Sequence, residues 1–400
     1  MRKFVASALI ASGLLFAICW FATTPKPPEN YTPRLSVALN VVDYRFFIKK
    51  CLVEESPYRP VSIAPRDACY PPLAYCLIKL FPLSSAGEAC YVVFLVCGLL
   101  CGLVLYLFER HRHCLLLCLG AVVLTVPFAS GPIKGNPSAW AGGAVLVYLA
   151  WYDSAELWKR MIAAVMLGFA TALKITPALF GLLYLRGKLF GPQGWPKEEI
   201  FVSGMSFLVL FSVPFIFFGG PNEVGVWLEN ALANAQYYSR EADFGLVPFF
   251  GLLDNWGSFV TLGVAAHLTT LTAIFLCLVS CFTDRLYLAL TLIGVAMVFL
   301  CHHDYGAVYV LPAFACWVSE VRSDARVGWF ENVLLLSESL CWFCVFQQIL
   351  CIHSYRAIVT NNYICNCAIT ILGILSLTHV AVAYWTNKKG LSAIAVKSRA

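Results

Sequence analysis

The chain has 400 residues, of which 60% are hydrophobic and only 12% are charged, with a formal net charge of +6 and a mean hydropathy of +0.76. A chain with so little polar surface cannot cover a soluble domain in water. Apolar runs long enough to span hydrocarbon recur along its length, and in lipid such runs satisfy their backbone hydrogen bonds by forming helices. The sequence therefore predicts an all-α, polytopic membrane bundle.

Residues 1–22 predict the first span. Met1-Arg2-Lys3 precedes an apolar run that is longer than the roughly 7 to 15 residues of a signal peptide, and Trp20 occupies a place where cleavage needs a small residue. We expect an uncleaved span with a cytoplasmic N-terminus. Residues 23–85 then form a long polar loop on the outside. Cys51 and Cys69 share this loop, and both a disulfide and two thiols are open alternatives.

The spans after this loop give a core over residues 86–320 and a C-terminal part over 321–400 with a cytoplasmic tail. Residues 161–185 are apolar but interrupted at Lys174, which predicts two short re-entrant helices that enter and leave on one side. A single crossing here is the alternative, but it would move the basic segment near Arg186 outside. About ten spans are expected, namely 1–22, 86–108, 114–131, 137–152, 200–218, 257–281, 285–301, 306–320, 328–350 and 363–385.

Lysine and arginine support this topology. They gather in the segments that the prediction places in the cytoplasm, whereas the short outer loops hold only Lys134, Arg240 and Arg356. Cytoplasmic loops of membrane proteins carry such an excess of positive charge. The long first loop is also basic, but loops beyond about 60 residues cross the membrane largely regardless of charge. The C-terminus is therefore expected in the cytoplasm.

Asp43 is the first candidate functional residue. It follows a moderately amphipathic stretch of the long loop, where a short helix would meet the lipid headgroups. Tyr44, Arg45 and Phe46 come directly after it and form an aromatic and cationic border suited to a lipid that carries a phosphate. A carboxylate in this position suits a general base that acts on an acceptor hydroxyl. The alternative is a solvated loop aspartate.

Three other polar sites lie in apolar surroundings. An ammonium group at Lys174 costs roughly 2.5 to 3.5 kcal/mol unless it faces a cavity, an interface or an anion, and snorkelling to the headgroups is the alternative. His302, His303 and Asp304 lie between two spans, where imidazoles donate to a phosphate and Asp304 orients one of them, or where all three cap helices. Asn136 lies in an outer turn that also fits a plain interhelical connection.

Motifs of other functional classes are missing from the sequence. We find no Cys/His spacing typical of zinc, no P-loop, no GxGxxG between a strand and a helix, and no GxSxG elbow. We expect no metal, no cofactor and no nucleic acid partner. Most of the 18 cysteines lie in or beside predicted spans, where cysteine behaves as a small hydrophobic residue.

Several motifs follow one another along the chain, namely Asp43, Ser56-Pro57-Tyr58, Tyr70-Pro71-Pro72-Leu73, Gly135-Asn136, the run from Gly168 through Lys174 to Pro177, and His302-His303-Asp304-Tyr305 followed by Leu311-Pro312. Their order resembles glycosyltransferase family 87, a group of membrane enzymes with the GT-C fold. The resemblance covers roughly residues 1–320. This chain has Gly-Asn where many members have Gly-Gln, and it lacks the second acidic residue after the first-loop acid, which argues against metal assistance.

The resemblance implies an enzyme of the cell membrane that moves a sugar, mannose or a similar one, from a polyprenyl-phosphate donor to a lipid or glycan acceptor at the outer face, with inversion. The proposed catalytic base of the family maps onto Asp43. The lysine and the histidine that bind the donor phosphate map onto Lys174 and onto His302 or His303. The expected helpers are Arg45 at the phosphate and Tyr70, Asn136 and Asp304 in support.

Two other functional classes stay open. A secondary transporter or lipid flippase also places charges near broken helices, although its two halves are commonly related and we find no convincing internal repeat. A non-catalytic membrane scaffold would tolerate changes at Asp43 and Lys174. A transferase would lose sugar transfer with its fold intact.

Overall fold

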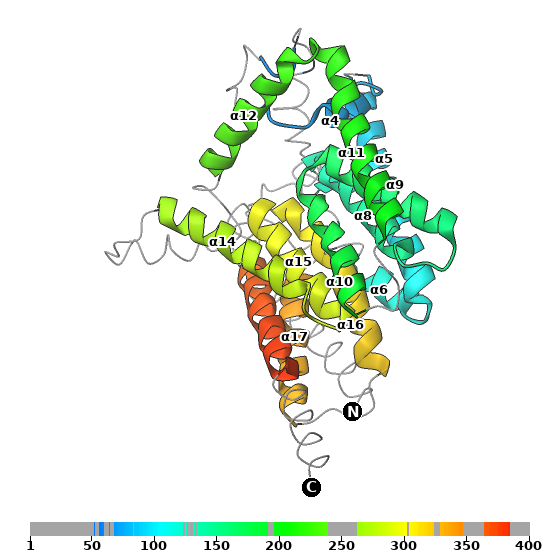
Figure 1. Cartoon of the computed structure of the whole chain (residues 1–400), viewed down its shortest axis with the longest axis vertical. Coiled ribbons are helices and arrows are strands. Elements are labelled where there is room, and N and C mark those ends of the chain that lie inside the picture. The colour runs from blue at the N-terminus through cyan, green and yellow to red at the C-terminus, as the bar shows by residue number, and fades with distance from the viewer. Residues whose placement is uncertain are drawn as a thin grey trace, which may run out of the picture.

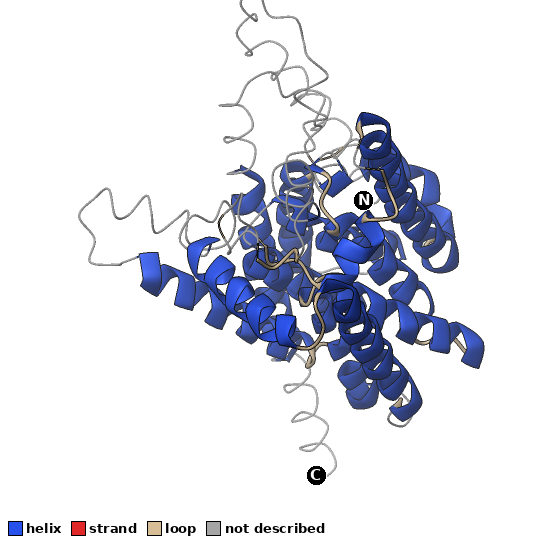
Figure 2. Cartoon of the chain, turned by 90° about the horizontal axis from the view of Figure 1, so that it is seen from above, coloured by secondary structure: helices blue, strands red, loops and turns tan. Residues whose placement is uncertain are grey.

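The computed structural model describes residues 52, 56–59, 64, 68–82, 84–122, 125, 128, 131–132, 134–190, 196–238, 262–301, 304–323, 329–346 and 364–384. Its elements in these ranges are all helices, so the predicted all-α class is confirmed for this part of the chain (Figures 1 and 2). In chain order they are α4 (Pro72–Ile78), α5 (Ser85–Arg110), η3 (Arg112–Cys114), α6 (Leu115–Val122), α8 (Ser138–Trp151), α9 (Leu157–Leu173), η4 (Thr176–Gly181), α10 (Leu182–Phe190), α11 (Lys197–Ser212), η5 (Val213–Phe218), α12 (Asn222–Tyr238), α14 (Leu262–Ser280), α15 (Leu286–Cys301), η6 (Asp304–Val310), α16 (Leu311–Ser323), α17 (Trp329–Val345) and a C-terminal helix (Ile364–Tyr384).

Three of the described helices are long and apolar enough to cross a membrane, namely Ala86–Arg110, Lys197–Phe218 and Ile364–Tyr384. Shorter apolar helices correspond to most of the other predicted spans, as expected for a multi-pass membrane protein. The agreement is looser at two places. Helix α6 ends at Val122, and most of the remainder of the predicted span 114–131 lies outside the described residues. The predicted span 306–320 begins as the 3-10 helix η6.

Helix α5 begins with a capped turn and packs closely on α8. The Ser84 hydroxyl accepts a hydrogen bond from the Gly87 N–H (3.2 Å), which satisfies an N–H that has no partner inside the helix. Along the contact with α8, small residues let the two backbones meet. A Cβ atom on Gly102 would lie only 2.4 Å from the Gly143 carbonyl oxygen, and one on Gly143 only 2.5 Å from the Gly98 oxygen. Membrane helices use such residues for close packing.

Helices α15 and α11 show how differently two apolar helices can be placed. In α15, residues 287–299 are all buried, so the helix runs through the interior of the bundle. Helix α11 leaves Phe201, Leu208 and Val209 at least half exposed, and Phe217 follows in η5 with 71% exposure. A helix that is apolar all round fits a buried core, whereas exposed apolar side chains of this density fit contact with lipid.

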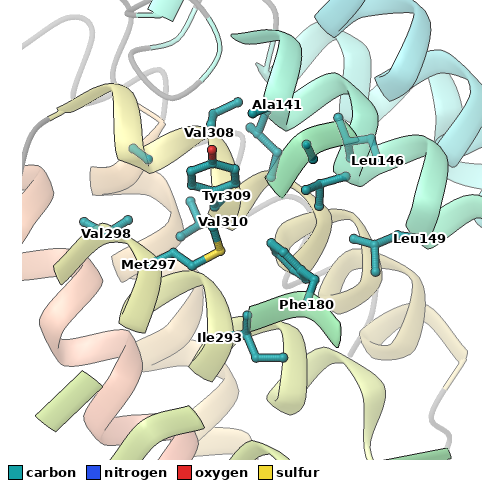
Figure 3. Close-up of a cluster of buried hydrophobic side chains, with 14 of the residues drawn as sticks. Ala141, Leu146, Leu149, Phe180, Ile293, Met297, Val298, Val308, Tyr309 and Val310 are labelled. Carbon is teal, nitrogen blue, oxygen red and sulfur yellow. The ribbon is translucent and has the colours of Figure 1, made fainter. Parts of the chain in front are cut away.

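A central cluster joins α8, α15 and the two 3-10 helices η4 and η6. Figure 3 shows Phe180 of η4 and Tyr309 of η6 among aliphatic side chains of α8 and α15. The two rings lie 6.4 Å apart between centroids, and both side chains are almost fully buried. Tyr148 of α8 also contacts η4, because its hydroxyl donates to the Phe180 carbonyl oxygen (3.2 Å). The short helices therefore belong to the core rather than to its surface.

Residues 157–190 leave one end of the bundle and return to the same end. Helix α9 is 17 residues long, longer than predicted because it begins at Leu157. The helix is interrupted at Lys174, as predicted, and the chain then runs back through η4 and α10. Arg160, near the start, donates to the Ser154 carbonyl oxygen (2.9 Å), and Arg186, near the finish, donates to the Thr283 carbonyl oxygen (3.0 Å). We call this the arginine-rich end.

The C-terminal helix is attached through a buried polar contact. Glu338 of α17 accepts a hydrogen bond from the Trp317 indole N–H (2.8 Å), and its other oxygen lies 2.9 Å from Nδ1 of His379 in the C-terminal helix. The Tyr287 hydroxyl of α15 lies 3.2 Å from the same nitrogen. All four side chains are at most 5% exposed. Buried charges persist when they are paired and hydrogen-bonded.

Candidate active site

The predicted site residues fall into two groups. Asp43, Arg45, His302 and His303 lie outside the described residues. Tyr70, Asn136 and Lys174 are described with their side chains, and of Asp304 the structure gives the backbone, at the start of η6. The three described side chains define the candidate site.

Lys174 lies at the break between α9 and η4. Its backbone is extended (φ −157°, ψ 126°), and its N–H still closes the last turn of α9 by donating to the Ala170 carbonyl oxygen (3.0 Å). Pro177 explains the break, because its nitrogen carries no hydrogen to bond the Leu173 carbonyl four residues earlier and its ring would clash with that carbonyl in a continuous α-helix. The partly buried ammonium group donates to the Ser138 hydroxyl at 2.7 Å. The break therefore places a cation beside the first residue of α8.

From Ser138 the hydrogen bonds continue to Asn136 and Tyr70. The Asn136 side-chain oxygen accepts from the Ser138 backbone N–H (2.9 Å) and from the Ser138 hydroxyl (2.6 Å). Its amide nitrogen donates to the Tyr70 hydroxyl (3.0 Å). Asn136 and Ser138 are fully buried. The structure thus joins Lys174, Ser138, Asn136 and Tyr70 in one row, which we call the polar relay.

The turn that carries Asn136 has a fixed geometry. Gly135 adopts a positive φ of 71°, which an L side chain rarely tolerates, and the Tyr91 hydroxyl donates to its carbonyl oxygen (3.1 Å). The Asn136 N–H closes the turn on the Gly131 carbonyl oxygen (2.8 Å). Glycine and hydrogen bonds together hold the Asn136 amide in place. The turn is therefore part of the site's scaffold.

Tyr70 is held from the other side by the loop that precedes α4. The Tyr58 hydroxyl lies 3.4 Å from the Tyr70 carbonyl oxygen, and the Trp227 indole N–H donates to the Cys69 carbonyl oxygen (3.1 Å). Asn230 donates to the Tyr58 carbonyl oxygen (2.8 Å). Trp227 and Asn230 belong to α12, so this helix fixes the described part of the first loop. Both α4 and α12 lie at the top of Figure 1.

An ion pair completes this attachment. Glu223, in the first turn of α12, accepts from the Ser56 hydroxyl (2.7 Å) and from Nε of Arg59 (2.9 Å). Glu223 is buried, whereas the Arg59 side chain is 61% exposed, so solvent screens the pair. The Ser56-Pro57-Tyr58 motif therefore has a structural role in the described residues. It anchors the loop that carries Tyr70.

A further contact links the break at Lys174 to the residue that precedes the two histidines. Thr176, two residues after Lys174, has its hydroxyl 3.7 Å from the Cys301 sulfur. Cys301 ends α15 and directly precedes His302 in the sequence. The break at Lys174 and the end of α15 are therefore neighbours.

The arginines lie elsewhere. Arg110 pairs with Asp153 and donates to the Ala150 carbonyl oxygen (3.0 Å), and Arg160 pairs with Glu199 (2.7 Å). These contacts surround the turn between α8 and α9, whereas Ser138 lies at the other end of α8. A helix of 14 residues is about 21 Å long. The polar relay and the arginine-rich end are thus at opposite ends of the bundle.

Sequence reasoning missed Ser138 and Glu223. Ser138 had a usable signal, since Asn-Pro-Ser at the start of an apolar helix fits an Asx turn that directs the serine N–H to the asparagine oxygen. Glu223 had none, because its partners are more than 160 residues away in the sequence. Within the described residues, no group of three or more His, Cys, Asp or Glu side chains is placed to hold a metal ion.

Comparisons with known proteins give the family. The model of glycosyltransferase family 87 matches residues 68–302, more than half of the chain. A search of curated protein sequences finds no match. Among solved structures, the crystal structure of ArnT from Cupriavidus metallidurans bound to undecaprenyl phosphate is similar, with a TM-score of 0.47 and 12% identity over 94% of this chain and 77% of ArnT. The predicted family is confirmed by the family match, and this membrane protein belongs to glycosyltransferase family 87.

Proposed function

We propose that this glycosyltransferase takes its sugar from a polyprenyl-phosphate donor and transfers it to a hydroxyl of a lipid or glycan acceptor at the outer face of the membrane. Family membership makes the chain a glycosyltransferase. The donor, the acceptor class, the membrane face and the roles of individual residues are our proposal. They rest on the polar relay and on the distribution of charge.

The observation that carries the proposal is the position of Lys174. Its ammonium group is oriented by the buried Ser138 hydroxyl, and that hydroxyl is fixed by Asn136. A hydroxyl that accepts a hydrogen bond orients the ammonium group, and this contact adds no negative charge beside it. A preorganised cation in a site that excludes water stabilises negative charge far better than one in bulk water. Lys174 is therefore assigned to the phosphate of the donor.

The proposed reaction is a single displacement. The acceptor hydroxyl attacks the anomeric carbon while the bond between that carbon and the phosphate oxygen breaks, through an oxocarbenium-like transition state. Asp43 accepts the hydroxyl proton as general base, and polyprenyl phosphate leaves as the dianion or its protonated form. One displacement inverts the anomeric configuration. No nucleotide is needed, because the sugar arrives already activated on a phosphate.

His302, His303 and Arg45 are proposed as further donors to the phosphate. The contact between Thr176 and Cys301 supports the two histidines, because it brings the residue before His302 close to the Lys174 break. Arg45 is assigned from the sequence alone, as the nearest cation to Asp43. Asp304 is proposed to orient one of the imidazoles.

The outer location of the site is inferred from charge. Arg110, Arg160 and Arg186 gather at the end of the bundle opposite Lys174. Positively charged residues favour the cytoplasmic side of a membrane protein. If the arginine-rich end is cytoplasmic, the polar relay faces outward. Both termini are proposed to be cytoplasmic.

A transfer assay tests the proposal. The purified full-length protein is reconstituted and offered polyprenyl phosphates carrying radiolabelled mannose, arabinofuranose, glucose or galactose, with a membrane lipid extract as the source of acceptors. We expect one donor to give a new labelled glycoside and Asp43→Asn to abolish it. Asp153→Asn, a change of the same type at the arginine-rich end, should keep transfer. Full activity of Asp43→Asn would remove Asp43 as the base.

A transporter or flippase is distinguished in the same vesicles. Movement of an intact labelled lipid across the bilayer without any new glycosidic bond would contradict the proposed reaction. A new glycoside whose formation does not require the polyprenyl donor would contradict the donor class.

A further inference from the structure

A cavity lies at the arginine-rich end, away from the polar relay. Its volume is about 220 Å³, and it is bounded by the ends of α5, α8 and α16 and by the beginning of α15. Arg110, His111, Tyr152 and Glu320 contribute its polar lining. Ser138 is the first residue of α8, and Tyr152 directly follows the last one. The cavity is therefore separate from the proposed site of transfer.

His111 points an acceptor into this region. The Tyr106 hydroxyl donates to the Pro312 carbonyl oxygen (3.1 Å), so its oxygen is left to accept from His111 Nε2, which lies 3.1 Å away. His111 therefore carries its proton on Nε2, and Nδ1 is an acceptor. His111 is only 6% exposed, and its Nδ1 has no hydrogen-bond partner among the described residues. A buried acceptor without a partner is costly and calls for a donor from a ligand or water.

His111 is also neutral near pH 7. Burial lowers the pKa of its imidazole to about 4, and the positive charge of Arg110 and the nearby His113 act in the same direction. Since the ring carries no second proton, Nδ1 keeps its lone pair at physiological pH. Glu320 supplies a second acceptor group at the cavity. Its carboxylate also accepts from the Tyr287 backbone N–H at 3.3 Å.

Cations surround these acceptors. The guanidinium group of Arg110, which also pairs with Asp153, lines the cavity. The charges of Arg186 and Arg285 act on Glu320, and that of Arg186 also acts on Tyr152. The cavity therefore offers positive charge on its rim and hydrogen-bond acceptors at His111 and Glu320. A ligand that matches both carries a phosphate and hydroxyl groups.

We propose that this cavity binds the head group of an anionic phospholipid that carries hydroxyls, with its phosphate toward Arg110 and a hydroxyl donating to Nδ1 of His111. The occupant is a lipid because the cavity lies where four apolar helices begin or end, and the ends of helices that cross a bilayer meet its headgroups. Basic pockets between membrane helices on the cytoplasmic side suit anionic head groups. The cavity is smaller than the roughly 300 to 1,000 Å³ of sites for drug-sized ligands, but it admits a head group whose tails remain in the bilayer.

Native mass spectrometry of the full-length protein tests this inference independently of sugar transfer. The protein, in detergent, is offered phosphatidylglycerol, phosphatidic acid, phosphatidylethanolamine and phosphatidylcholine with identical acyl chains. We expect phosphatidylglycerol to be retained at least tenfold more than phosphatidylcholine. His111→Gln should lose most of this preference, because glutamine can still donate to Tyr106 but has no acceptor in the place of Nδ1. Arg110→Gln should lose it as well.

The control variant is Arg112→Gln. Arg112 lies at the same end, but its guanidinium group stacks on Phe108 (5.0 Å to the ring centroid) and does not line the cavity. It should keep the preference for phosphatidylglycerol. This result would show that the preference comes from the cavity and not from a general attraction of anionic lipid to positive charge at this end. Leu286→Phe fills the cavity from its edge and should weaken retention even if Arg110→Gln fails to fold.

Four results would overturn the proposal. Equal retention of phosphatidylcholine would exclude recognition of the charge, and equal retention of phosphatidic acid would exclude recognition of hydroxyls. Unchanged retention in both His111→Gln and Leu286→Phe would move the lipid away from this cavity. Free glycerol phosphate that competes as well as the lipid at equal concentration would replace the lipid with a soluble ligand.

Discussion

The two ends of the helical bundle hold their cations in different ways. At one end, Lys174 donates to the Ser138 hydroxyl, and the hydrogen bonds continue through neutral side chains. At the other end, Arg110 and Arg160 each pair with a carboxylate. A carboxylate offsets part of the charge of its partner, whereas a hydroxyl orients a cation through a hydrogen bond. The two kinds of contact therefore predict different effects when the cation is removed.

The sharpest test of this comparison removes one cation from each end of the molecule. We expect Lys174→Ala to lower the rate of sugar transfer about 10² to 10³-fold with little change in thermal stability, which is the range for removing one group that stabilises developing charge. Arg160→Ala should do the reverse, because it leaves the buried carboxylate of Glu199 without its ion-pair partner. The transfer rate and the melting temperature of both variants test this expectation. A large loss of transfer in Arg160→Ala alone would reverse the two roles.

The response to acid should also differ between the ends. Unfolded His111 binds a proton below about pH 6.5, whereas the native ring, whose pKa burial lowers to about 4, does not. The unfolded state thus binds more protons between these values, and stability falls as pH falls from 6.5 to 4, by about 3 kcal/mol for a shift of this size. Thermal unfolding of wild type and His111→Gln at pH 7.5 and 5 measures it. An equal loss in both proteins would show that other groups titrate.

Packing between the two ends can be tested with two glycines. A Cβ atom on Gly168 of α9 would lie 2.6 Å from the Ser203 carbonyl oxygen of α11, whereas one on Gly204 would meet nothing within 4 Å. We expect Gly168→Ala to destabilise by about 1 to 3 kcal/mol, since backbone must move. Gly204→Ala should be neutral or stabilise by up to about 1 kcal/mol. Chemical denaturation in detergent compares them, and equal stabilities would contradict the close approach of α9 and α11.

The smallest expected effect lies at the far end of the polar relay. Tyr70→Phe removes the hydroxyl that accepts from the Asn136 amide, at a cost of about 1 kcal/mol. The melting temperature should fall slightly, and transfer should fall less than in Lys174→Ala. Tyr384→Phe is the control, because this side chain is 64% exposed. A larger loss of transfer in Tyr70→Phe than in Lys174→Ala would place the reacting groups nearer Tyr70.

The sequence was most informative where a single residue breaks a pattern. The interruption at Lys174 was predicted because a charge and Pro177 stand in an apolar run, and the helix ends there. The turn with Asn136 was singled out for its glycines and prolines, and in the structure Gly135 takes a positive φ there and the Asn136 N–H closes the turn on the Gly131 carbonyl oxygen. Both features depend on local physics, since helix breaks and turns are set by residues close together in the chain.

Long-range partners escaped prediction. Nothing local indicates that Ser138 would accept from Lys174, 36 residues away, or that Glu338 would meet His379. Hydropathy also failed to separate α11 from α15, because an apolar side chain is equally favourable against lipid and against protein. The roles of Asp43, His302 and His303 stay predictions, since they lie outside the described residues.

The buried contact between Glu338 and His379 constrains how this protein can be recombined. It fastens the C-terminal part, which lies beyond the region matched by the family model, to Tyr287 and Trp317 nearby. A chimera that joins residues 321–400 to the core of a relative keeps Glu338 with His379, but it removes the Trp317 donor of Glu338 and the Tyr287 hydroxyl beside His379 unless both aromatic residues travel with the segment. Domain exchange in this protein should therefore be planned around four side chains rather than around a boundary in the sequence.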